Sequence, residues 1–354
     1  MMSSEILHRC KKKAAMERVR LGKTNLLVNK LGWGGIPIQR VGEDEAVAVI
    51  GSVVKTGVDL LDTARGYTNS ERRIGLALQK VSRSVVLSTK SQERTDKIYD
   101  DVHESLRQLK VQNIHIYHMH YVRTSEEYRQ VMAPGGAYEG LQRARDEGLI
   151  DHIGMTSHDF RILERAIEDE CVEVIMAAYS FLEPEASQRV FPLALAKDIG
   201  VLAMKPFSGG IIEDAGLALR FVLSTPGIVT IPGSETLEKA NENWRVFAES
   251  RSLTENDRRM IEAIRKDFEH QFCRRCDYCQ PCSKGINIQA VLGLKGVVKR
   301  LGPKVQELGW LNDALQKSRD CSECGECLLR CPYQLLIPDL IKQNLAWYEG
   351  LQEQ

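Results

Sequence analysis

The chain has 354 residues, of which 43% are hydrophobic, so it can form one large or two smaller domains with a sizeable buried core. Lysine plus arginine and aspartate plus glutamate both number 48, and this balance argues against a general binder of nucleic acid or of anionic membranes. No run approaches 18 consecutive apolar residues, and residues 1–17 read as a polar, loosely held tail without an apolar signal core. We therefore expect a cytoplasmic protein with no membrane partner.

Strand and helix patterns alternate from residue 18 to residue 250. Val19–Gly35 predicts a short hairpin that turns at Gly22 and Lys23, followed by the first strand. Seven further strands are expected at Val58–Leu61, Val85–Thr89, Ile114–Met119, His152–Thr156, Val172–Ala178, Val201–Met204 and Ile228–Ile231. Strands that alternate with helices run parallel, and eight such units in roughly 230 residues favour a closed (β/α)8 barrel, a TIM barrel of the α/β class. No G-x-G-x-x-G follows a strand, which weakens a doubly wound alternative.

The chain changes character after the barrel pattern. Within that pattern, the polar segment Val122 to Gly136 is expected to be a loop at the mouth of a pocket. Thr254 to Asp257 resembles a capping box, and we expect a linker helix over residues 251–271. Residues 272–354 form a separate, cysteine-rich region.

Four polar residues stand where predicted strands end or just beyond. Asp62 ends the second strand, Tyr67 lies in the next loop, and Lys90 and His120 end the third and fourth strands. These ends share one face of a parallel barrel, so we expect the four side chains to converge. For Asp62 and Tyr67 alone, a turn-capping carboxylate and a packed loop phenol explain the pattern equally well. The two later strand ends favour a site.

These residue types suit the reduction of a carbonyl by a hydride donor. An unperturbed phenol has a pKa of about 10, and we expect the Lys90 ammonium to lower the pKa of Tyr67 while Asp62 holds Lys90 in position. Tyr67 would donate a proton to the developing alkoxide, and His120 would orient the carbonyl oxygen by hydrogen bonding.

The first 250 residues resemble an aldo-keto reductase. The segments D-T-A-R-G-Y, V-V-L-S-T-K and I-Y-H-M-H carry the Asp-Tyr-Lys-His tetrad of that family at Asp62, Tyr67, Lys90 and His120. The resemblance extends to the segments Ile153–His158 and Ile231–Asn243. It implies NADPH-dependent carbonyl reduction or the reverse oxidation of an alcohol.

The resemblance also implies a cofactor site, with NADP(H) as the expected cofactor. The residues expected to bind it are Thr156, Ser157, Lys205, Ser234, Lys239, Glu242 and Asn243. The usual Gln, Tyr and Lys of three further positions are Met176, Met204 and Gly233 here. Lys239 replaces an arginine, which keeps the charge and loses the bidentate fork that grips a phosphate. The N-terminus of the last barrel helix would offer backbone N–H groups to an anion.

The ten cysteines are distributed unevenly. Cys10 and Cys171 stand alone, and eight lie between Cys273 and Cys331. Clustered cysteines in a long intracellular chain favour metal binding over disulfides. The first run has x2, x2, x2 spacing at Cys273, Cys276, Cys279 and Cys282. The second has x2, x2, x3 spacing followed by Pro332, the full bacterial ferredoxin pattern, at Cys321, Cys324, Cys327 and Cys331.

We therefore predict two 4Fe–4S clusters. Three cysteines of one run hold a cluster, and the cysteine that precedes proline reaches the other cluster. The predicted ligand sets are Cys273, Cys276, Cys279 with Cys331, and Cys321, Cys324, Cys327 with Cys282. Ser283 rather than proline follows Cys282, so this last ligand departs from the pattern. Structural zinc is the alternative, although zinc ribbons separate two C-x2-C knuckles by a longer stretch.

The combination resembles aldo-keto-reductase-like oxidoreductases that carry a C-terminal ferredoxin-like domain. Hydride transfer moves two electrons together, whereas a cluster moves one, so three hypotheses arise. In the first, the barrel exchanges electrons with the clusters, which pass them to or from a ferredoxin- or flavodoxin-like carrier. In the second, the barrel reduces a small carbonyl compound and the clusters are only structural or redox-sensing. In the third, the protein is a non-catalytic electron-transfer or scaffold protein. We favour the first, because two clusters exceed what a structural role needs.

Overall fold

A computed structural model describes residues 17–352 in two compact units. The barrel unit comprises the described residues up to Ser180, with Pro184–Pro206 and Asp214–Leu253. The C-terminal unit comprises the described residues from Thr254, with two short segments, Phe181–Glu183 and Phe207–Glu213. Cys10 and nearly all of the predicted tail lie outside the described residues.

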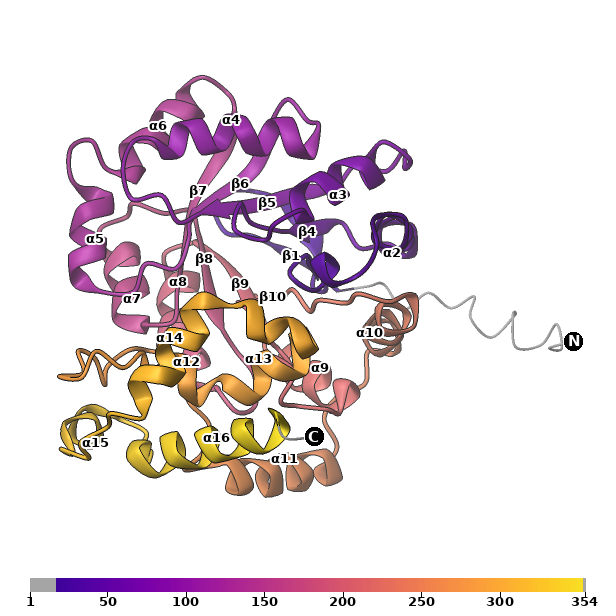
Figure 1. Cartoon of the computed structure of the whole chain (residues 1–354). Coiled ribbons are helices and arrows are strands. Elements are labelled where there is room, and N and C mark those ends of the chain that lie inside the picture. Colours follow the sequence, from indigo (N-terminus) through magenta and orange to yellow (C-terminus); the bar gives the residue numbers. More distant parts are fainter. Residues whose placement is uncertain (1–16, 353–354) are drawn as a thin grey trace, which may run out of the picture. The chain divides into compact units, whose positions relative to one another are not determined.

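The barrel unit contains eight parallel strands in sequential order (Figure 1). They are β3 (Trp33–Gly34), β4 (Leu60–Asp62), β5 (Val86–Ser91), β6 (Ile114–Met119), β7 (Ile150–Ser157), β8 (Val174–Ala178), β9 (Gly200–Met204) and β10 (Val229–Thr230). Parallel bridges from Leu31 to Thr230 and from Gly34 to Gly233 join the two edges, so the sheet closes on itself. The predicted (β/α)8 barrel is confirmed.

An antiparallel hairpin precedes the barrel, as predicted. It pairs β1 (Arg18–Arg20) with β2 (Leu27–Asn29). Its buried side chains, Val19, Leu21 and Val28, join an apolar cluster with residues that include Leu60, Ile116, Val174, Met176, Leu202 and Val229. The hairpin therefore closes one end of the barrel core.

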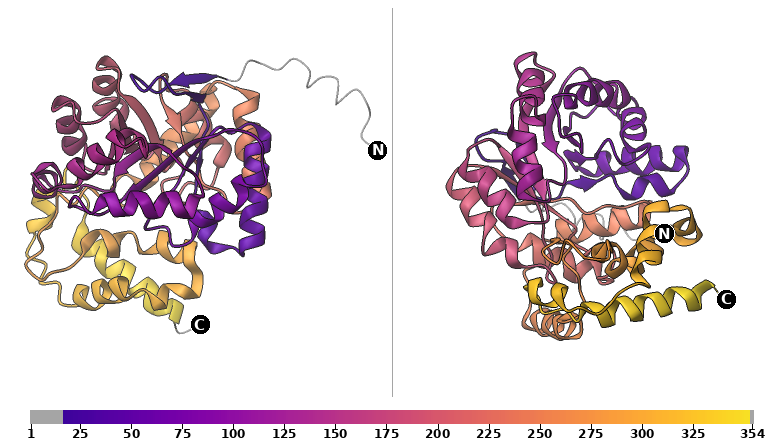
Figure 2. Two further views of the ribbon diagram at one scale, coloured as in Figure 1. Left: turned by 90° about the horizontal axis from the view of Figure 1, so that it is seen from above. Right: turned by 60° about the vertical axis from the view of Figure 1, so that its left-hand side comes forward.

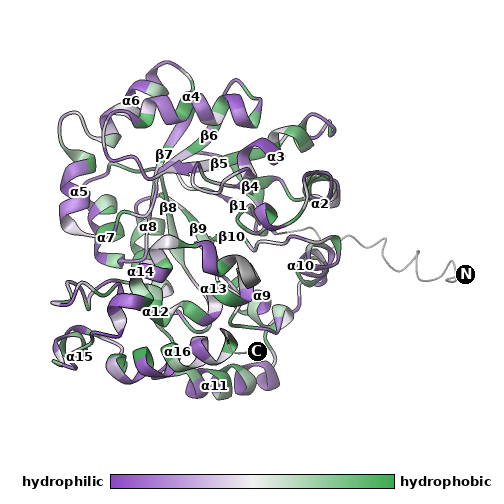
Figure 3. Cartoon of the chain, in the orientation of Figure 1, coloured by the Kyte–Doolittle hydropathy of each residue, from purple (hydrophilic) through white to green (hydrophobic). Residues whose placement is uncertain are grey.

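Helices lie outside the strands, and their apolar faces pack against the sheet (Figures 2 and 3). They are η1 (Pro37–Arg40), α2 (Glu43–Thr56), α3 (Ser70–Leu78), α4 (Ile98–Leu109), α5 (Ser125–Met132), α6 (Ala137–Asp146), α7 (Phe160–Glu168), η2 (Glu185–Ser187), α8 (Val190–Ala196), α9 (Ala215–Leu223) and α10 (Leu237–Glu249). Burying one apolar stripe per helix stabilises this arrangement.

The expectation of a loop from Val122 to Gly136 is wrong, because this segment contains α5. Thr124 caps the helix by accepting a hydrogen bond from the Glu127 backbone N–H. Only Tyr128 and Val131 of α5 are buried, so the helix is too polar for the apolar periodicity to reveal it.

The C-terminal unit is helical. It contains α11 (Glu255–Phe268), α12 (Ile288–Leu292), α13 (Leu294–Leu301), η3 (Gly302–Glu307), α14 (Gly309–Ser318), α15 (Glu326–Arg330) and α16 (Ile337–Gln352). Thr254 and Asp257 form the expected capping box at the start of α11. A core that includes Val291, Leu311, Leu315, Leu335 and Ile341 holds the unit together. Among the described residues, no helix is both long and apolar enough to cross a bilayer.

Candidate functional site

The structure brings Asp62, Tyr67, Lys90 and His120 together at the C-terminal ends of adjacent strands. Lys90 Nζ donates hydrogen bonds to Asp62 Oδ2 at 2.6 Å and to the Thr63 carbonyl at 2.7 Å. Lys90 Nζ lies 5.3 Å from the centroid of the Tyr67 ring, and the Tyr67 and His120 rings meet edge to face at 6.0 Å. The expected convergence of the four side chains is therefore present.

Lys90 and Asp62 form a buried ion pair, with side-chain exposures of 2% and 4%. Burial raises the pKa of Asp62 and lowers that of Lys90, and the attraction between the two charges opposes both shifts. A buried pair of this kind is costly to break, because removing either partner leaves an uncompensated charge. The ion pair therefore fixes the position of the Lys90 ammonium.

The expected lowering of the Tyr67 pKa is wrong. Burial, and then the negative charge of Asp62, raise the pKa of Tyr67 above its usual value. The ammonium does not reverse this shift, because Lys90 approaches the face of the ring and donates its short hydrogen bonds to Asp62 and Thr63. Tyr67 is consequently a neutral proton donor over the physiological range.

His120 is also neutral. Burial, with the positive charge of Lys90 as the next largest cause, holds the pKa of His120 well below its usual value. Its buried Nδ1 has no hydrogen-bond partner within the described chain. A neutral imidazole beside a phenol can donate a hydrogen bond to a carbonyl oxygen without carrying charge.

Two interior residues of this site, Ser88 and His118, were missed by the sequence analysis. Ser88 lies two residues before Lys90 on β5, and His118 lies two residues before His120, in β6. Side chains two apart on a strand point to the same face, so strand periodicity could have placed both beside the tetrad.

The predicted cofactor residues on β7 have their hydroxyls engaged in the fold. Thr156 Oγ1 accepts a hydrogen bond from the Tyr121 backbone N–H at 2.7 Å, and Ser157 Oγ donates to the Val122 carbonyl at 2.6 Å. Met176, on the neighbouring strand, is 1% exposed and belongs to the interior apolar cluster. These contacts favour a structural role for the Thr156 and Ser157 hydroxyls.

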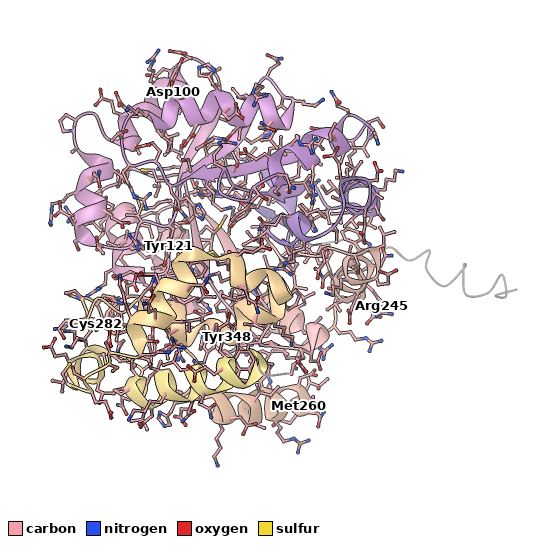
Figure 4. The ribbon with its side chains drawn as sticks, viewed as in Figure 1. Asp100, Tyr121, Arg245, Met260, Cys282 and Tyr348 are labelled. Carbon is pink, nitrogen blue, oxygen red and sulfur yellow. The ribbon has the colours of Figure 1, made fainter. Side chains whose placement is uncertain are left out.

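A basic side chain stands at another strand end. Lys205, directly after β9, has its Nζ 2.8 Å from Nε2 of His158, which follows β7. The edge of the His158 ring meets the ring of Tyr121, a side chain labelled in Figure 4, at a centroid distance of 5.6 Å. Lys205 also contributes to the lowered pKa of His120, after the larger contributions of burial, Lys90, His118 and Arg94. Its positive charge therefore acts on the tetrad.

Two cations gather at the N-terminus of α10. Lys239 Nζ lies 2.6 Å from Glu235 Oε1, and Arg40 approaches the same carboxylate at 3.8 Å. Arg40 is a basic residue of this site that the sequence analysis missed, because it is remote in sequence. With two cations against one carboxylate at a helix N-terminus, the donor set fits a phosphate.

The other predicted residues near α10 differ in exposure. Ser234 is fully buried, and its Oγ accepts a hydrogen bond from the Trp33 indole N–H at 2.9 Å. Asn243 is buried and Glu242 is exposed on the helix. Gly233 has a packing reason for lacking a side chain, since a Cβ there would lie 2.5 Å from Pro37 Cγ.

Gly233→Ala should therefore destabilise the barrel unit. Overpacking of this kind costs about 1–3 kcal/mol, measurable as a lower midpoint of thermal unfolding. Gly51→Ala is the matched control, because Gly51 lies in α2 with open space around it and alanine favours a helix by up to about 1 kcal/mol. Equal effects of the two substitutions would contradict the close approach of Pro37.

The eight clustered cysteines line two cavities in the C-terminal unit. One cavity has Cys273, Cys276, Cys279 and Cys331 among its wall residues. The other is lined by Cys282 (labelled in Figure 4), Cys321, Cys324 and Cys327, and also by Cys279. These are the two predicted ligand sets, so Cys331 and Cys282 each reach across to the other run.

The donor chemistry of the cavities fits iron–sulfur clusters. Cysteine thiols line both cavities, four in the first and five in the second, together with apolar side chains such as Ile337 and Ile341, and such surroundings hold thiolate-ligated clusters. Among residues 17–352, no three His, Cys, Asp or Glu side chains converge closely enough to share a single metal ion. The thiols are instead spread around the two cavities.

The first cysteine loop is tied to a segment that follows strand β8. Arg275, between Cys273 and Cys276, pairs with Glu183 at 2.8 Å, and the side chains are 19% and 4% exposed. Phe181, two residues earlier, accepts a hydrogen bond from Arg265 of α11 through its carbonyl at 2.7 Å. Only four residues lie between Ala178, the end of β8, and Glu183. The segment Phe181–Glu183 therefore holds the first cysteine loop within the C-terminal unit.

Glu183→Gln is expected to destabilise the C-terminal unit by about 1–3 kcal/mol, the usual cost of leaving a buried group unsatisfied, because the largely buried Arg275 charge loses its counter-ion. Denaturant unfolding monitored by the helical circular dichroism signal would measure the loss. Glu323→Gln is the control, because it breaks an exposed pair with Lys342 and should cause no measurable change. A Glu183→Gln protein as stable as the wild type would show that Arg275 needs no partner.

The comparisons with known proteins agree with this geometry. The profile of the aldo/keto reductase family matches residues 29–216, and that of a 4Fe-4S dicluster domain matches residues 272–336. The chain belongs to the aldo/keto reductase family. It is an oxidoreductase of this type that carries a C-terminal 4Fe-4S dicluster domain.

Several individual proteins are similar to the chain. L-galactose dehydrogenase of Arabidopsis thaliana is 27% identical over 219 residues, covering 55% of this chain and 67% of the relative. NADH-specific methylglyoxal reductase of Escherichia coli is 25% identical over 228 residues, covering 56% of this chain and 69% of the relative. The solved structure of an aldo-keto reductase from Bacillus halodurans in its holo form superposes with a TM-score of 0.60 at 21% identity, covering 70% of this chain and 96% of that one. The structure of an aldo/keto reductase from Klebsiella pneumoniae in complex with NADP and acetate superposes with a TM-score of 0.59 at 19% identity, covering 71% of this chain and 95% of that one. The structural likeness concerns the fold.

Proposed function

We propose that the barrel reduces a small carbonyl compound, or oxidises the corresponding alcohol, with Tyr67 as the proton donor. The observation that carries this is the meeting of the Tyr67 phenol, the buried Lys90–Asp62 pair and the neutral His120 at adjacent strand ends. Tyr67 transfers a proton to the oxygen on which negative charge develops, and His120 orients that oxygen. Lys90 supplies a fixed positive charge beside the phenol, which favours the loss of its proton in the transition state.

A nicotinamide cofactor is the proposed hydride source, since NAD(P)H supplies hydride when it is bound. Lys239 and Arg40 would hold a phosphate at the N-terminus of α10, and Ser234, Glu242 and Asn243 belong to the same region. Lys205 offers a further charge for a cofactor phosphate. We propose NADP(H), and a comparison of NADPH with NADH at equal concentration tests that preference.

We further propose that the C-terminal unit holds two 4Fe–4S clusters that exchange electrons with the barrel. The support is the Arg275–Glu183 pair, which ties the first cysteine loop to the segment directly after β8. The proposal rests on this connection together with the presence of two cavities.

The second cavity offers the surface for an external carrier. Cys324 is exposed, and Leu329, between Cys327 and Cys331, is 91% exposed. An exposed cluster edge flanked by an apolar side chain suits transient docking of a small electron carrier, here proposed to be ferredoxin- or flavodoxin-like.

The deciding experiment is an anaerobic titration of the oxidised holoprotein with NADPH and, separately, with NADH. Cluster absorbance and nicotinamide fluorescence are followed together. Bleaching of the visible absorbance would support electron exchange between nicotinamide and clusters. A fluorescence change without bleaching favours the second candidate, a carbonyl reductase whose clusters are structural or redox-sensing. If neither signal moves, the cofactor proposal fails, and a non-catalytic electron-transfer or scaffold role becomes the better account.

A further inference from the structure

A row of buried polar groups lies behind the Lys90–Asp62 pair. Ser88 Oγ donates to Asp62 Oδ1 at 2.8 Å, and Nε2 of His118 lies 3.1 Å from Ser88 Oγ. Asp62, Ser88 and His118 are 3%, 1% and 0% exposed. Strand register creates the row, because Asp62 pairs with Ser88 across β4 and β5, and Lys90 pairs with His118 across β5 and β6.

The hydrogen bonds in this row have one consistent direction. An ionised Asp62 can only accept, so the single hydroxyl proton of Ser88 goes to it. His118 must then donate to Ser88 Oγ from a protonated Nε2, which leaves Nδ1 without a proton. That Nδ1 is buried and has no partner within the described chain. Burial and the charge of Lys90 hold the pKa of His118 well below its usual value, in keeping with a neutral ring.

Gly154 on β7 makes room for this ring. A Cβ at position 154 would lie 2.2 Å from Nδ1 of His118 and 2.8 Å from the Val174 carbonyl. The barrel wall therefore holds the imidazole from the side opposite Ser88. A buried polar side chain confined in this way has one orientation, in which Nε2 faces Ser88.

We propose that Ser88 and His118 are positioning residues of the oxidoreductase site. His118 orients the Ser88 hydroxyl, which donates to Asp62 Oδ1, while Lys90 donates to Asp62 Oδ2. With both oxygens hydrogen-bonded, the carboxylate neither rotates nor takes up a proton. Lys90 is thereby held charged, 5.3 Å from the centre of the Tyr67 ring. This inference rests on the proposed function of the tetrad.

The groups that face this row are those whose ionisation would appear in the same pH profile. They are Glu71 and Asp62 near Lys90, and Tyr67, His120, Arg94 and Lys205 on the side of the tetrad. None of them is altered in the variants below.

The first test compares Ser88→Ala, His118→Leu, His118→Gln and the double variant Ser88→Ala/His118→Leu with the wild type. The assay is NAD(P)H-dependent reduction of a panel of small aldehydes and ketones that includes methylglyoxal. A lost hydrogen bond to a charged group should lower kcat about 10- to 100-fold in Ser88→Ala. The acid limb of the kcat profile should move about one pH unit upward, because the lost bond had lowered the pKa of Asp62.

The other variants separate positioning from folding. His118→Gln keeps a donor near Nε2 and should retain most of the activity, whereas His118→Leu should not. The double variant replaces both partners by apolar groups and should recover stability relative to Ser88→Ala while staying slow. The proposal would be overturned if the double variant recovered kcat together with stability. It would also be overturned if the acid limb of the kcat profile did not move in Ser88→Ala.

The second test needs no turnover. Because the Ser88 bond stabilises only the ionised form of Asp62, its contribution exists above the pKa of Asp62 and disappears as the pH falls through it. The difference in thermal unfolding midpoint between wild type and Ser88→Ala should therefore shrink toward acid pH. Ser105→Ala is the matched control, because Ser105 is buried and forms a hydrogen bond with the neutral Tyr117 hydroxyl. The difference in unfolding midpoint between the wild type and Ser105→Ala should therefore be the same at every pH.

The two tests fail separately. If the wild type reduces nothing in the panel, the proposed function falls, while the acid dependence still decides whether Ser88 holds Asp62 ionised. If the wild type is active and the Ser88→Ala difference is independent of pH, the positioning role is wrong and the tetrad proposal stands.

Discussion

Replacing Tyr67 by phenylalanine is expected to lower kcat for carbonyl reduction by a factor of about 10² to 10⁴, the usual contribution of a positioned general acid. The substitution removes only the phenolic oxygen. The ring that lies beside His120 and over Lys90 remains, so cofactor binding and the thermal unfolding midpoint should change little. Steady-state kinetics with either nicotinamide, combined with fluorescence titration of the cofactor, measure both effects.

Tyr117→Phe is the matched control. Tyr117 lies on β6, is fully buried and bonds Ser105 at 3.2 Å, away from the tetrad. It should leave kcat within a few-fold of the wild type. A Tyr67→Phe protein with full activity would remove the tetrad from every catalytic proposal and favour a non-catalytic barrel.

The raised pKa of Tyr67 gives the two reaction directions opposite pH dependence. Reduction needs the protonated phenol, so Tyr67 should cause no loss of reductive kcat below pH 10, the ordinary value of the group. Oxidation needs the phenolate as a base, so its rate should rise with pH over the same range. A reductive rate that falls near neutrality would mean that Lys90 lowers the Tyr67 pKa after all.

The barrel could be predicted from the sequence because each strand is a short apolar run, and most of the helices between the strands repeat apolar residues with helical spacing. The failure at α5 shows the limit of this approach, since that helix buries only Tyr128 and Val131. The position of α5 is fixed mainly by contacts with segments that are distant in the sequence, and the residue pattern of one segment does not predict such contacts.

The tetrad could be predicted for a similar reason. Asp62, Lys90 and His120 end consecutive strands, and parallel closure brings such ends together whatever the side-chain details. The direction of the pKa shift of Tyr67 could not be predicted, because it is set by the burial of the ring and by the charge of Asp62, which depend on the folded structure. Ser88 and His118 follow from strand periodicity once the register of β4, β5 and β6 is known.

Arg40 and Glu183 mark what no local pattern reveals. Arg40 reaches Glu235 across nearly the whole barrel sequence, and Glu183 pairs with Arg275, which lies 92 positions further along the chain. Both are ordinary surface-type residues in their own segments. Only the three-dimensional fold gives each of them a charged partner in a functional region.

The crossed ligand sets make a prediction about pairs of cysteine substitutions. Each 4Fe–4S cluster needs four thiolates, so the holoprotein should hold about eight irons and a single Cys→Ala variant about four. Cys331 and Cys276 line the same cavity, whereas Cys331 and Cys324 line different ones. Cys331→Ala/Cys276→Ala should therefore still hold one cluster, and Cys331→Ala/Cys324→Ala should hold none.

Iron analysis of anaerobically purified protein, with low-temperature electron paramagnetic resonance after reduction, counts the clusters in each variant. Cys171→Ala is the control, because Cys171 is buried in the barrel core near Tyr128 and should leave the iron content unchanged. The reverse order, in which Cys331→Ala/Cys276→Ala loses all iron and Cys331→Ala/Cys324→Ala keeps half, would show that each run binds its own cluster. Retention of a single zinc per run would replace both clusters by structural zinc sites, and electron exchange with the barrel would then have no carrier.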